Sequence, residues 1–188
     1  MILKGKNAFI TGATGGLGRE ICNFLNKSGC NVFIIGRNKE KLLELQRSLG
    51  KNCLGYSVCD LENVSSIQDT VKKYLASFNV DILINCAGVF PVSSLEETPV
   101  ETYDKCFNVN VRAPFLLCKL FGEKMRKKKW GRIVNICSSS SYTGNRGTSV
   151  YCASKHALLG LSRALYDELK EDGIRVFSVS PGSIKTPM

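Results

Sequence analysis

The sequence predicts an α/β domain built on a doubly wound parallel β-sheet, and two patterns support this fold class. Short apolar runs rich in β-branched residues recur along the chain, as expected for parallel strands that are covered on both faces. Longer segments with apolar residues at helical spacing separate these runs, so that strands and helices alternate. Right-handed crossovers between the strands then give a doubly wound sheet. The 188 residues are enough for one such domain and not comfortably enough for two.

Six strands are expected, and each follows from an apolar run. In chain order the runs are residues 8–10, 32–35, 53–58, 82–84, 133–136 and 176–179, of which the third is the weakest. Apolar residues three or four positions apart indicate the helices between them. These are Leu17, Ile21 and Leu25; Leu42, Leu45 and Leu49; Val64, Ile67, Val71 and Leu75; and Leu158, Leu161, Leu165 and Leu169. Gly29 and Gly173 stand where helix C-caps belong.

The composition excludes several classes of protein. Apolar residues make up 44% and charged residues 22%, the balance of a folded soluble chain, and no apolar run is long enough to span a membrane. The first residues lack an apolar stretch of signal-peptide length, so we expect a cytoplasmic protein. There are nine cysteines but no CxxC pair, and His156 is the only histidine. A metal site or a disulfide framework is therefore not expected, and buried free thiols suit a reducing cytosol.

The net charge of +10 raises the question of nucleic-acid binding. The densest basic run contains one aromatic residue, Trp130, and lies where a long helix should end, so its charge suits the helix dipole. It comprises Lys124, Arg126, Lys127, Lys128, Lys129 and Arg132. We favour a solvated helix end over a nucleic-acid surface.

A glycine-rich turn follows the first strand and precedes the first helix. Its residues 11–18 read TGATGGLG, with Gly12, Gly16 and Gly18 spaced as GxxxGxG. Glycines allow a tight turn in which backbone N–H groups approach an anion, and the helix N-terminus adds partial positive charge. Glycines in such a turn can also serve packing alone. Its place in the sheet favours a pyrophosphate site, and hence a dinucleotide-binding (Rossmann) domain over residues 1–188.

The end of the second strand bears on which dinucleotide binds. An acidic residue there would bond a free ribose hydroxyl, but the chain has Gly36 and Arg37 instead. A guanidinium group suits a phosphate by charge and by bidentate geometry. We therefore predict NADP(H) in preference to NAD(H), the alternative being that Arg37 is an ordinary exposed arginine.

Candidate catalytic residues follow the fifth strand. Tyr151 and Lys155 are one helical turn apart and share a face, and a nearby ammonium is expected to lower the phenol pKa. Such a tyrosine can exchange a proton with a carbonyl or alcohol oxygen, and Ser138 from the preceding loop can hold the same oxygen. A tyrosine and lysine at this spacing also occur by chance in many helices. Their position downstream of a nucleotide cradle favours the catalytic interpretation.

Taken together, six motifs in order resemble those of the short-chain dehydrogenase/reductase family, and within it the NADP(H)-using reductases related to 3-oxoacyl-carrier-protein reductase. The resemblance covers nearly the whole chain. Beyond the residues already named, it rests on Asp60-Leu61, on Asn85-Cys86-Ala87-Gly88 (the family's NNAG), on Asn110, on Ser138 thirteen residues before Tyr151, and on residues 181–186, which resemble PGxIxT. Cys86 departs from the second asparagine of NNAG, and Gly15 stands where many NADP(H)-dependent members carry a basic residue.

The resemblance implies a role for each site residue. Tyr151 is the general acid or base, Lys155 lowers its pKa and bonds the nicotinamide ribose, and Ser138 orients the substrate carbonyl. Asn110 positions a water in a proton relay, and Ile184 and Thr186 bracket the nicotinamide. The implied cofactor-binding residues are Gly12, Thr14, Gly16, Leu17, Gly18, Arg37, Asp60, Leu61, Cys86, Ala87, Gly88, Tyr151, Lys155, Ile184 and Thr186.

The resemblance also implies an activity and an assembly. We expect hydride transfer between NADP(H) and a small-molecule carbonyl or secondary alcohol, with a catalytically silent nucleotide-binding regulatory or scaffold protein as the alternative. Relatives pair two long helices, which correspond here to residues 100–128 and 149–170, so a homodimer or homotetramer is expected. Members of the group continue into a substrate-covering segment, a last helix and a seventh strand, so we expect either that this sequence is truncated or that the protein is a natural or engineered fragment. The sixth strand is then expected at an exposed edge, and residues 89–98 and 139–148 are expected to influence substrate choice.

Overall fold

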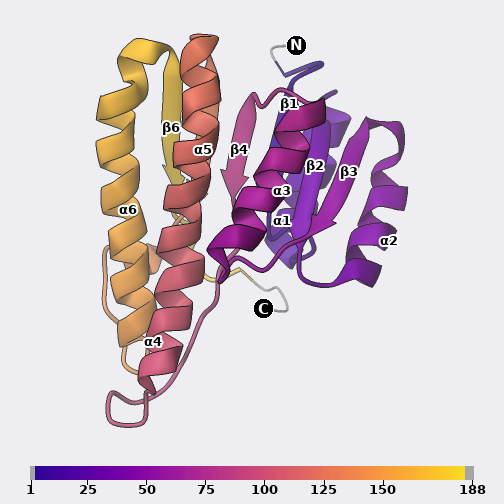
Figure 1. Ribbon diagram of the computed structural model, residues 1–188. Helices are drawn as coiled ribbons and strands as arrows, with labels where there is room; N and C mark the ends of the chain where they lie inside the picture. The colour runs from indigo at the N-terminus through magenta and orange to yellow at the C-terminus, as the bar shows by residue number, and fades with distance from the viewer. Residues whose placement is uncertain (1–2, 185–188) are drawn as a thin grey trace.

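The computed structural model describes residues 3–184, and its centre is a parallel sheet of six strands (Figure 1). The strand order β3-β2-β1-β4-β5-β6 confirms the predicted doubly wound topology. The strands are β1 (Asn7–Thr11), β2 (Asn31–Gly36), β3 (Cys53–Val58), β4 (Ile82–Asn85), β5 (Gly131–Ile136) and β6 (Ile174–Val179). The order reverses between β1 and β4, which pair in parallel, so a crevice is expected beyond their carboxyl ends.

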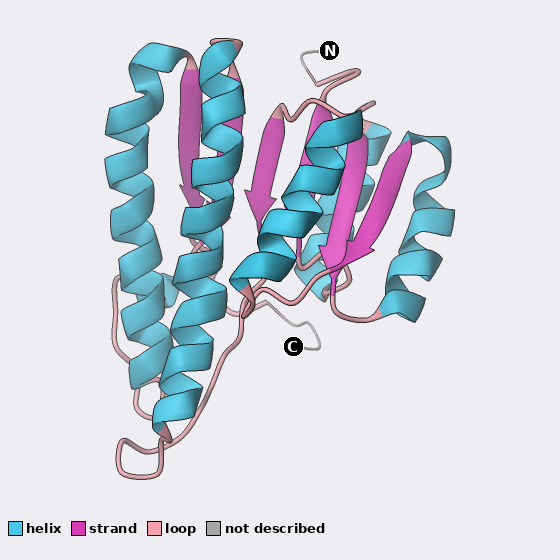
Figure 2. Cartoon of the chain, viewed as in Figure 1, coloured by secondary structure: helices cyan, strands magenta, loops and turns pink. Residues whose placement is uncertain are grey.

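Helices connect successive strands and cover the sheet (Figure 2). They are α1 (Gly16–Lys27), α2 (Lys39–Leu49), α3 (Val64–Ser77), α4 (Val100–Phe107), α5 (Ala113–Lys127) and α6 (Ser149–Leu169). Short 3-10 turns are η1 (Gly50–Asn52), η3 (Ser139–Ser141) and η4 (Lys170–Asp172). Gly29 and Gly173 adopt positive φ values of 81° and 74° directly after helical segments, as predicted for C-caps.

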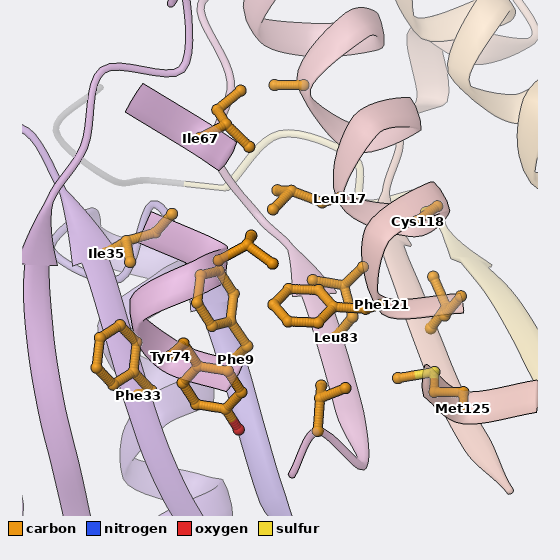
Figure 3. Packing of buried hydrophobic residues seen from close by; sticks show 14 of the residues in the cluster. Phe9, Phe33, Ile35, Ile67, Tyr74, Leu83, Leu117, Cys118, Phe121 and Met125 are labelled. Carbon is orange, nitrogen blue, oxygen red and sulfur yellow. The ribbon is translucent and has the colours of Figure 1, made fainter. Parts of the chain in front are cut away.

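An aromatic cluster fills the space between the sheet and helices α3 and α5 (Figure 3). Phe9 of β1 lies at its centre, with ring centroids 4.8 Å from Phe121, 5.2 Å from Tyr74 and 5.5 Å from Phe33. Phe9 and Phe121 are fully buried, so this cluster contributes several kcal/mol of hydrophobic stabilisation, at about 1.5–3 kcal/mol for each large side chain. A second cluster packs α1 and α2 on β1, β2 and β4.

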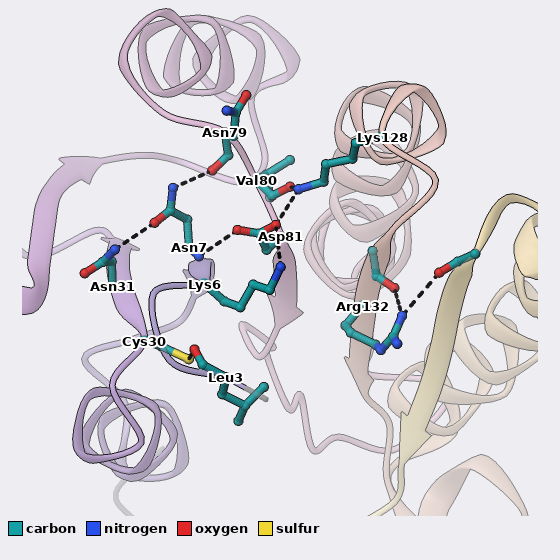
Figure 4. A network of polar contacts seen from close by, with 12 residues as sticks. Leu3, Lys6, Asn7, Cys30, Asn31, Asn79, Val80, Asp81, Lys128 and Arg132 are labelled. Carbon is teal, nitrogen blue, oxygen red and sulfur yellow. Dashed lines mark hydrogen bonds and ion pairs between the residues drawn. The ribbon is translucent and has the colours of Figure 1, made fainter. Parts of the chain in front are cut away.

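Asp81 lies where the strands begin, at the end of the sheet opposite their carboxyl ends, and joins several segments there (Figure 4). Its carboxylate accepts hydrogen bonds from the backbone N–H of Asn7 at 2.9 Å and from Lys128 Nζ at 2.6 Å, and Lys6 Nζ lies 3.8 Å away. Lys6 and Arg132 also flank the Trp130 ring, at 4.1 and 4.6 Å from its centroid. These contacts hold the starts of β1, β4 and β5 and the end of α5 together, at the end of the sheet away from the crevice.

The basic run lies at the end of α5, as predicted, and several of its side chains meet carboxylates. Arg126 Nε is 3.0 Å from Asp172, Lys129 Nζ is 2.5 Å from the same carboxylate, and Lys127 pairs with Glu123 at 2.9 Å. Several of the basic groups at this helix end therefore form ion pairs with carboxylates of the same chain.

The predicted long helix over residues 100–128 is not regular throughout. A π-helical segment, η2 (Asn108–Arg112), lies between α4 and α5. A π-helical turn contains one residue more than an α-helical turn, so the side chains after it point in a different direction. Such turns are common at functional sites. The sequence pattern alone does not show this insertion, because apolar residues continue at similar spacing on both sides of it.

The sequence also led to expectations about the cysteines, membrane-spanning segments, metal sites and the edge of the sheet. All nine cysteines are free thiols, seven of them buried. No helix within residues 3–184 is long and apolar enough to cross a membrane, and no cluster of metal-ligating side chains occurs in that same part of the chain. Strand β6 forms one edge of the sheet, and its Phe177 and Val179 are exposed.

Candidate active site

The turn between β1 and α1 is shaped by contacts that only glycine allows. Gly12 has φ of 65°, and a Cβ atom there would lie 2.7 Å from the Cα of Ala87. A Cβ on Gly18 would collide with the carbonyl oxygen of Gly12. The backbone therefore passes close to the segment after β4 and turns directly into α1, which supports the predicted cradle.

At the start of α1, no side chain of the helix or its N-cap accepts a hydrogen bond from the first backbone N–H groups. Gly15 stands at the N-cap position, where no side chain bonds the first turn, and that turn contains no acidic residue. The first N–H groups of a helix carry partial positive charge and lack intrahelical partners. Thr14 and Leu17 lie beside this opening and are half-buried. An anionic group such as a pyrophosphate fits these donors.

Thr11 is a site residue that the motif analysis did not single out. Its buried Oγ1 accepts hydrogen bonds from the backbone N–H groups of Cys86 and Ala87, both at 3.0 Å. It therefore fixes the segment Cys86-Ala87-Gly88 against the end of β1. The signal in the sequence was a polar residue at the end of an apolar strand.

The ends of β2 and β3 lie side by side. Gly36 accepts a backbone hydrogen bond of 3.0 Å from Cys59, which places Arg37 and Asp60 at the same edge. Both charged side chains are exposed, whereas Leu61 is buried. A Cβ on Gly36 would lie 3.3 Å from Thr14 Oγ1, so the second strand ends against the glycine-rich turn.

Asn110 sits at the centre of a buried polar node in the π-helical segment. Its Oδ1 accepts from the backbone N–H of Val89 at 2.9 Å, and its Nδ2 donates to the Val89 carbonyl at 3.0 Å. The same Nδ2 lies 3.0 Å from Ser154 Oγ and 3.3 Å from Cys106 Sγ. Asn110 and Ser154 are fully buried. The node ties η2 to the loop after β4 and to α6.

The side chain of Lys155 extends from α6 towards Asn110 and Gly88. Its side chain is buried, and Nζ donates a 2.7 Å hydrogen bond to the carbonyl of Ile136 at the end of β5. A Cβ on Gly88 would lie 3.6 Å from Lys155 Nζ and 3.4 Å from Asn110 Oδ1. The structure thus brings Asn110 and Lys155 together around a glycine. Burial lowers the pKa of Lys155 below its usual value.

Tyr151 lies one turn before Lys155 on α6, as predicted, with Lys155 Nζ 5.7 Å from the centre of its ring. Its ring also packs edge-to-face against Phe90, with centroids 4.6 Å apart. The expected lowering of the Tyr151 pKa is wrong for this structure. Partial burial raises that pKa, a hydrogen bond with Ser138 opposes the shift, and neighbouring thiols add to it.

Ser138 is held by its own loop. Its Oγ accepts from the backbone N–H of Ser140 at 3.1 Å, and its N–H donates to Ser141 Oγ at 3.2 Å. These bonds leave the hydroxyl proton of Ser138 available to another acceptor.

The segment after β6 runs beside this loop, because Ser139 N–H donates to the Pro181 carbonyl at 2.9 Å. Ile184 follows and is exposed, whereas Thr186 lies outside the described residues. The predicted site residues within residues 3–184 thus all lie on segments at the carboxyl ends of the strands.

This arrangement defines a class of protein: a dinucleotide-binding fold with a tyrosine, a lysine, a serine and an asparagine at the carboxyl ends of its strands. The family model of the short chain dehydrogenases matches residues 6–188. The chain belongs to the short chain dehydrogenase family of oxidoreductases.

Similar proteins of named activity are oxidoreductases as well. The 3-oxoacyl-[acyl-carrier-protein] reductase FabG of Rickettsia prowazekii is 38% identical over 186 residues, which cover 99% of this chain and 76% of that protein. A metagenomic short-chain oxidoreductase in complex with NADP has a TM-score of 0.92 at 32% identity, covering 98% of this chain and 86% of its own. A 4-hydroxyisoleucine dehydrogenase complexed with NADH has a TM-score of 0.91 at 30% identity, with 97% and 75% covered.

Proposed function

We propose that this protein transfers hydride between NADP(H) and a carbonyl or secondary alcohol, with Tyr151 as the general acid in reduction and the general base in oxidation. Lys155 Nζ and Asn110 Oδ1 both lie beside Gly88, and Lys155 is one helical turn after Tyr151 on α6, with Nζ 5.7 Å from the centre of the Tyr151 ring. This grouping is the main support for the proposal. A module that only binds a nucleotide has no need for a buried lysine beside a half-buried phenol.

The residues present fit a dinucleotide. The first turn of α1 has no side-chain cap and no acidic residue, so its backbone N–H groups remain for a phosphate. Gly12 and Gly18 let the backbone pass closely enough to form this turn, because a Cβ at either would collide with neighbouring backbone atoms. Bound NADPH supplies the hydride, while the protein supplies placement and electrostatics. The residues proposed to hold it are Gly12, Thr14, Gly16, Leu17, Gly18, Arg37, Asp60, Leu61, Cys86, Ala87, Gly88, Tyr151, Lys155, Ile184 and Thr186.

The proton steps use groups of this chain. Ser138 and the Tyr151 hydroxyl hold the carbonyl oxygen, and Tyr151 releases its proton to that oxygen as negative charge develops there. The ammonium of Lys155 then favours the phenolate that forms. Asn110 holds the backbone of Val89 through both amide atoms, and we propose that it orders the water through which the proton is replaced.

NADP(H) is proposed in preference to NAD(H). Arg37 is exposed at the end of β2, and no carboxylate among the described residues pairs with it. Its guanidinium is therefore available to a ribose phosphate. One similar structure holds NADP and another NADH, so the fold itself is compatible with either cofactor.

The setting of the enzyme is proposed on the same basis. We propose one dinucleotide-binding domain over residues 1–188 in a cytoplasmic homodimer or homotetramer. Free thiols throughout the chain suit a reducing compartment. Exposed aromatic residues on α4 and α5, Tyr103 and Phe115, offer an apolar surface for a second copy.

NADPH oxidation separates this function from the silent alternative. Purified protein would be mixed with NADPH and a panel of ketones, aldehydes and 3-oxoacyl thioesters, with NADPH binding followed by fluorescence in parallel. The proposal expects absorbance loss with at least one carbonyl class. Binding of NADPH without oxidation across the whole panel would support a regulatory or scaffold protein instead.

A further inference from the structure

Phe90 is a large apolar side chain that remains exposed beside the proposed acid. It lies two residues after Gly88, and its ring meets that of Tyr151 at 79° with centroids 4.6 Å apart. Even so, 45% of Phe90 is exposed. Ligand sites are lined mainly by apolar and aromatic side chains, so an exposed ring next to the proposed acid is suited to contact an apolar part of a substrate.

The backbone on both sides of Phe90 is anchored. Val89 is held by Asn110 through its N–H at 2.9 Å and its carbonyl at 3.0 Å. Three residues after Phe90, Ser93 N–H donates to the Gly147 carbonyl at 2.9 Å, which ties this loop to the one that leads into α6. Pro91 further restricts the backbone of Phe90. The ring is therefore presented to solvent in a fixed place and is pre-organised for a ligand.

The neighbouring side chains are apolar too. Residues 89–92 are Val, Phe, Pro and Val. Val92 is 64% exposed, and its Cγ1 lies 3.6 Å from the position that a Cβ on Gly147 would take. A substrate hydroxyl placed against Phe90 and Val92 would lose water, and neither of these side chains can form a hydrogen bond to it.

We propose that Phe90 and Val92 form the subsite for an apolar substituent of the substrate, so that the enzyme favours carbonyl compounds with an aryl or alkyl group over polyhydroxylated ones. This inference rests on the proposed function and specifies its substrate class. The carbonyl lies at Tyr151 and Ser138, and the substituent packs on the exposed part of the Phe90 ring.

Methyl ketones that share one reacting group test the subsite. The expected kcat/KM of the wild-type enzyme is at least about tenfold higher for benzylacetone than for hydroxyacetone, the size of effect that an apolar pocket gives. Phe90→Ala is expected to lower the value for benzylacetone about tenfold and that for hydroxyacetone less than about twofold. Phe90→Leu should retain most of the preference. Phe24→Ala removes a similarly exposed ring from the last turns of α1 and should leave both values unchanged.

Several outcomes overturn the inference and are distinct from failure of the proposed function. A wild-type preference for hydroxyacetone contradicts it, as does an equal loss for both ketones in Phe90→Ala, which would mean that Phe90 only steadies Tyr151. If no carbonyl compound of the whole panel is reduced, the proposed function fails. The subsite is then tested by NMR titration of the NADPH-loaded protein with benzylacetone, and equal Kd values for wild type and Phe90→Ala would refute it.

Discussion

The side-chain amide of Asn110 donates a 3.0 Å hydrogen bond to the hydroxyl of Ser154, three residues after Tyr151 on α6. Ser154 in turn donates to the carbonyl of Tyr151 at 2.7 Å. Both side chains are fully buried, so neither can exchange these bonds for bonds to water. The π-helical segment and the helix of the proposed acid are thereby fixed relative to each other.

Loss of this bond should affect the proton steps more than cofactor binding. For Ser154→Ala we expect kcat to fall about tenfold with little change in the Kd of NADPH, because Asn110 loses a partner worth about 1–1.5 kcal/mol. The measurement is kcat as a function of pH, together with NADPH titration.

Ser162→Ala is the matched control for that variant. Ser162 is another buried serine of α6, and it bonds Asn135 Nδ2 at 2.8 Å and the Leu158 carbonyl at 2.7 Å. The Ser162→Ala substitution should lower the free energy of unfolding without altering the dependence of kcat on pH. Identical pH profiles for Ser154→Ala and the wild type would remove Ser154 from the positioning role.

Gly12→Ala should damage both folding and cofactor affinity. The residue has φ of 65°, and the new methyl group would lie 2.7 Å from backbone atoms of Ala87, which must move. We expect a loss of about 1–3 kcal/mol in the free energy of unfolding, measured in urea, and weaker NADPH binding.

Gly15→Ala serves as the comparison in the same turn. Gly15 has an ordinary φ of −74°, and the methyl group added by this substitution would have its nearest neighbour, the Gly12 carbonyl oxygen, 3.4 Å away. Its free energy of unfolding should stay close to that of the wild type. An equal loss in both variants would contradict the steric explanation.

Arg37→Asp should exchange the cofactor preference. Removal of the guanidinium takes away the partner of the ribose phosphate, and the carboxylate repels that phosphate while accepting a bond from a free hydroxyl. We expect kcat/KM for NADPH to fall at least about tenfold while the value for NADH holds or rises. Equal wild-type values for the two cofactors, or an unchanged ratio in the variant, would show that Arg37 does not select the cofactor.

The pH dependence of reduction follows from two opposite shifts. Burial raises the pKa of Tyr151 and lowers that of Lys155. The phenol of Tyr151 therefore keeps its proton throughout the neutral range, as a general acid in reduction must. The kcat/KM for carbonyl reduction should be flat around neutral pH and fall only at alkaline pH, whereas alcohol oxidation should rise with pH. A tyrosinate absorbance signal that appears between about pH 6 and pH 8 in the wild type and is absent from Tyr151→Phe would contradict the raised pKa of Tyr151.

Much of the fold could be predicted because burial leaves a strong pattern in the sequence. Continuous apolar runs such as 32–35 belong to strands covered on both faces, and Phe33 and Ile34 are indeed buried there. The glycines of the first turn were informative for a different reason, since Gly12 has a backbone conformation that other residues rarely adopt.

Other features depend on contacts between distant segments and leave little local signal. Thr11 and Ser154 are ordinary residue types whose importance lies in bonds to residues 75 and 44 positions away. The rise in the Tyr151 pKa reflects how deeply α6 is packed, which spacing alone cannot show. The π-helical segment is similarly hidden, because one extra residue in a turn hardly alters an apolar pattern.

Single-turnover reduction by Tyr151→Phe would show whether the Tyr151 hydroxyl is the proton donor. The variant keeps the ring that packs on Phe90 and removes only the hydroxyl, so its NADPH affinity should stay within about twofold of the wild type. The account predicts that the rate constant for carbonyl reduction falls at least about a hundredfold, the contribution expected of a general acid. A rate constant equal to that of the wild type, with NADPH still bound, would show that Tyr151 is not the proton donor.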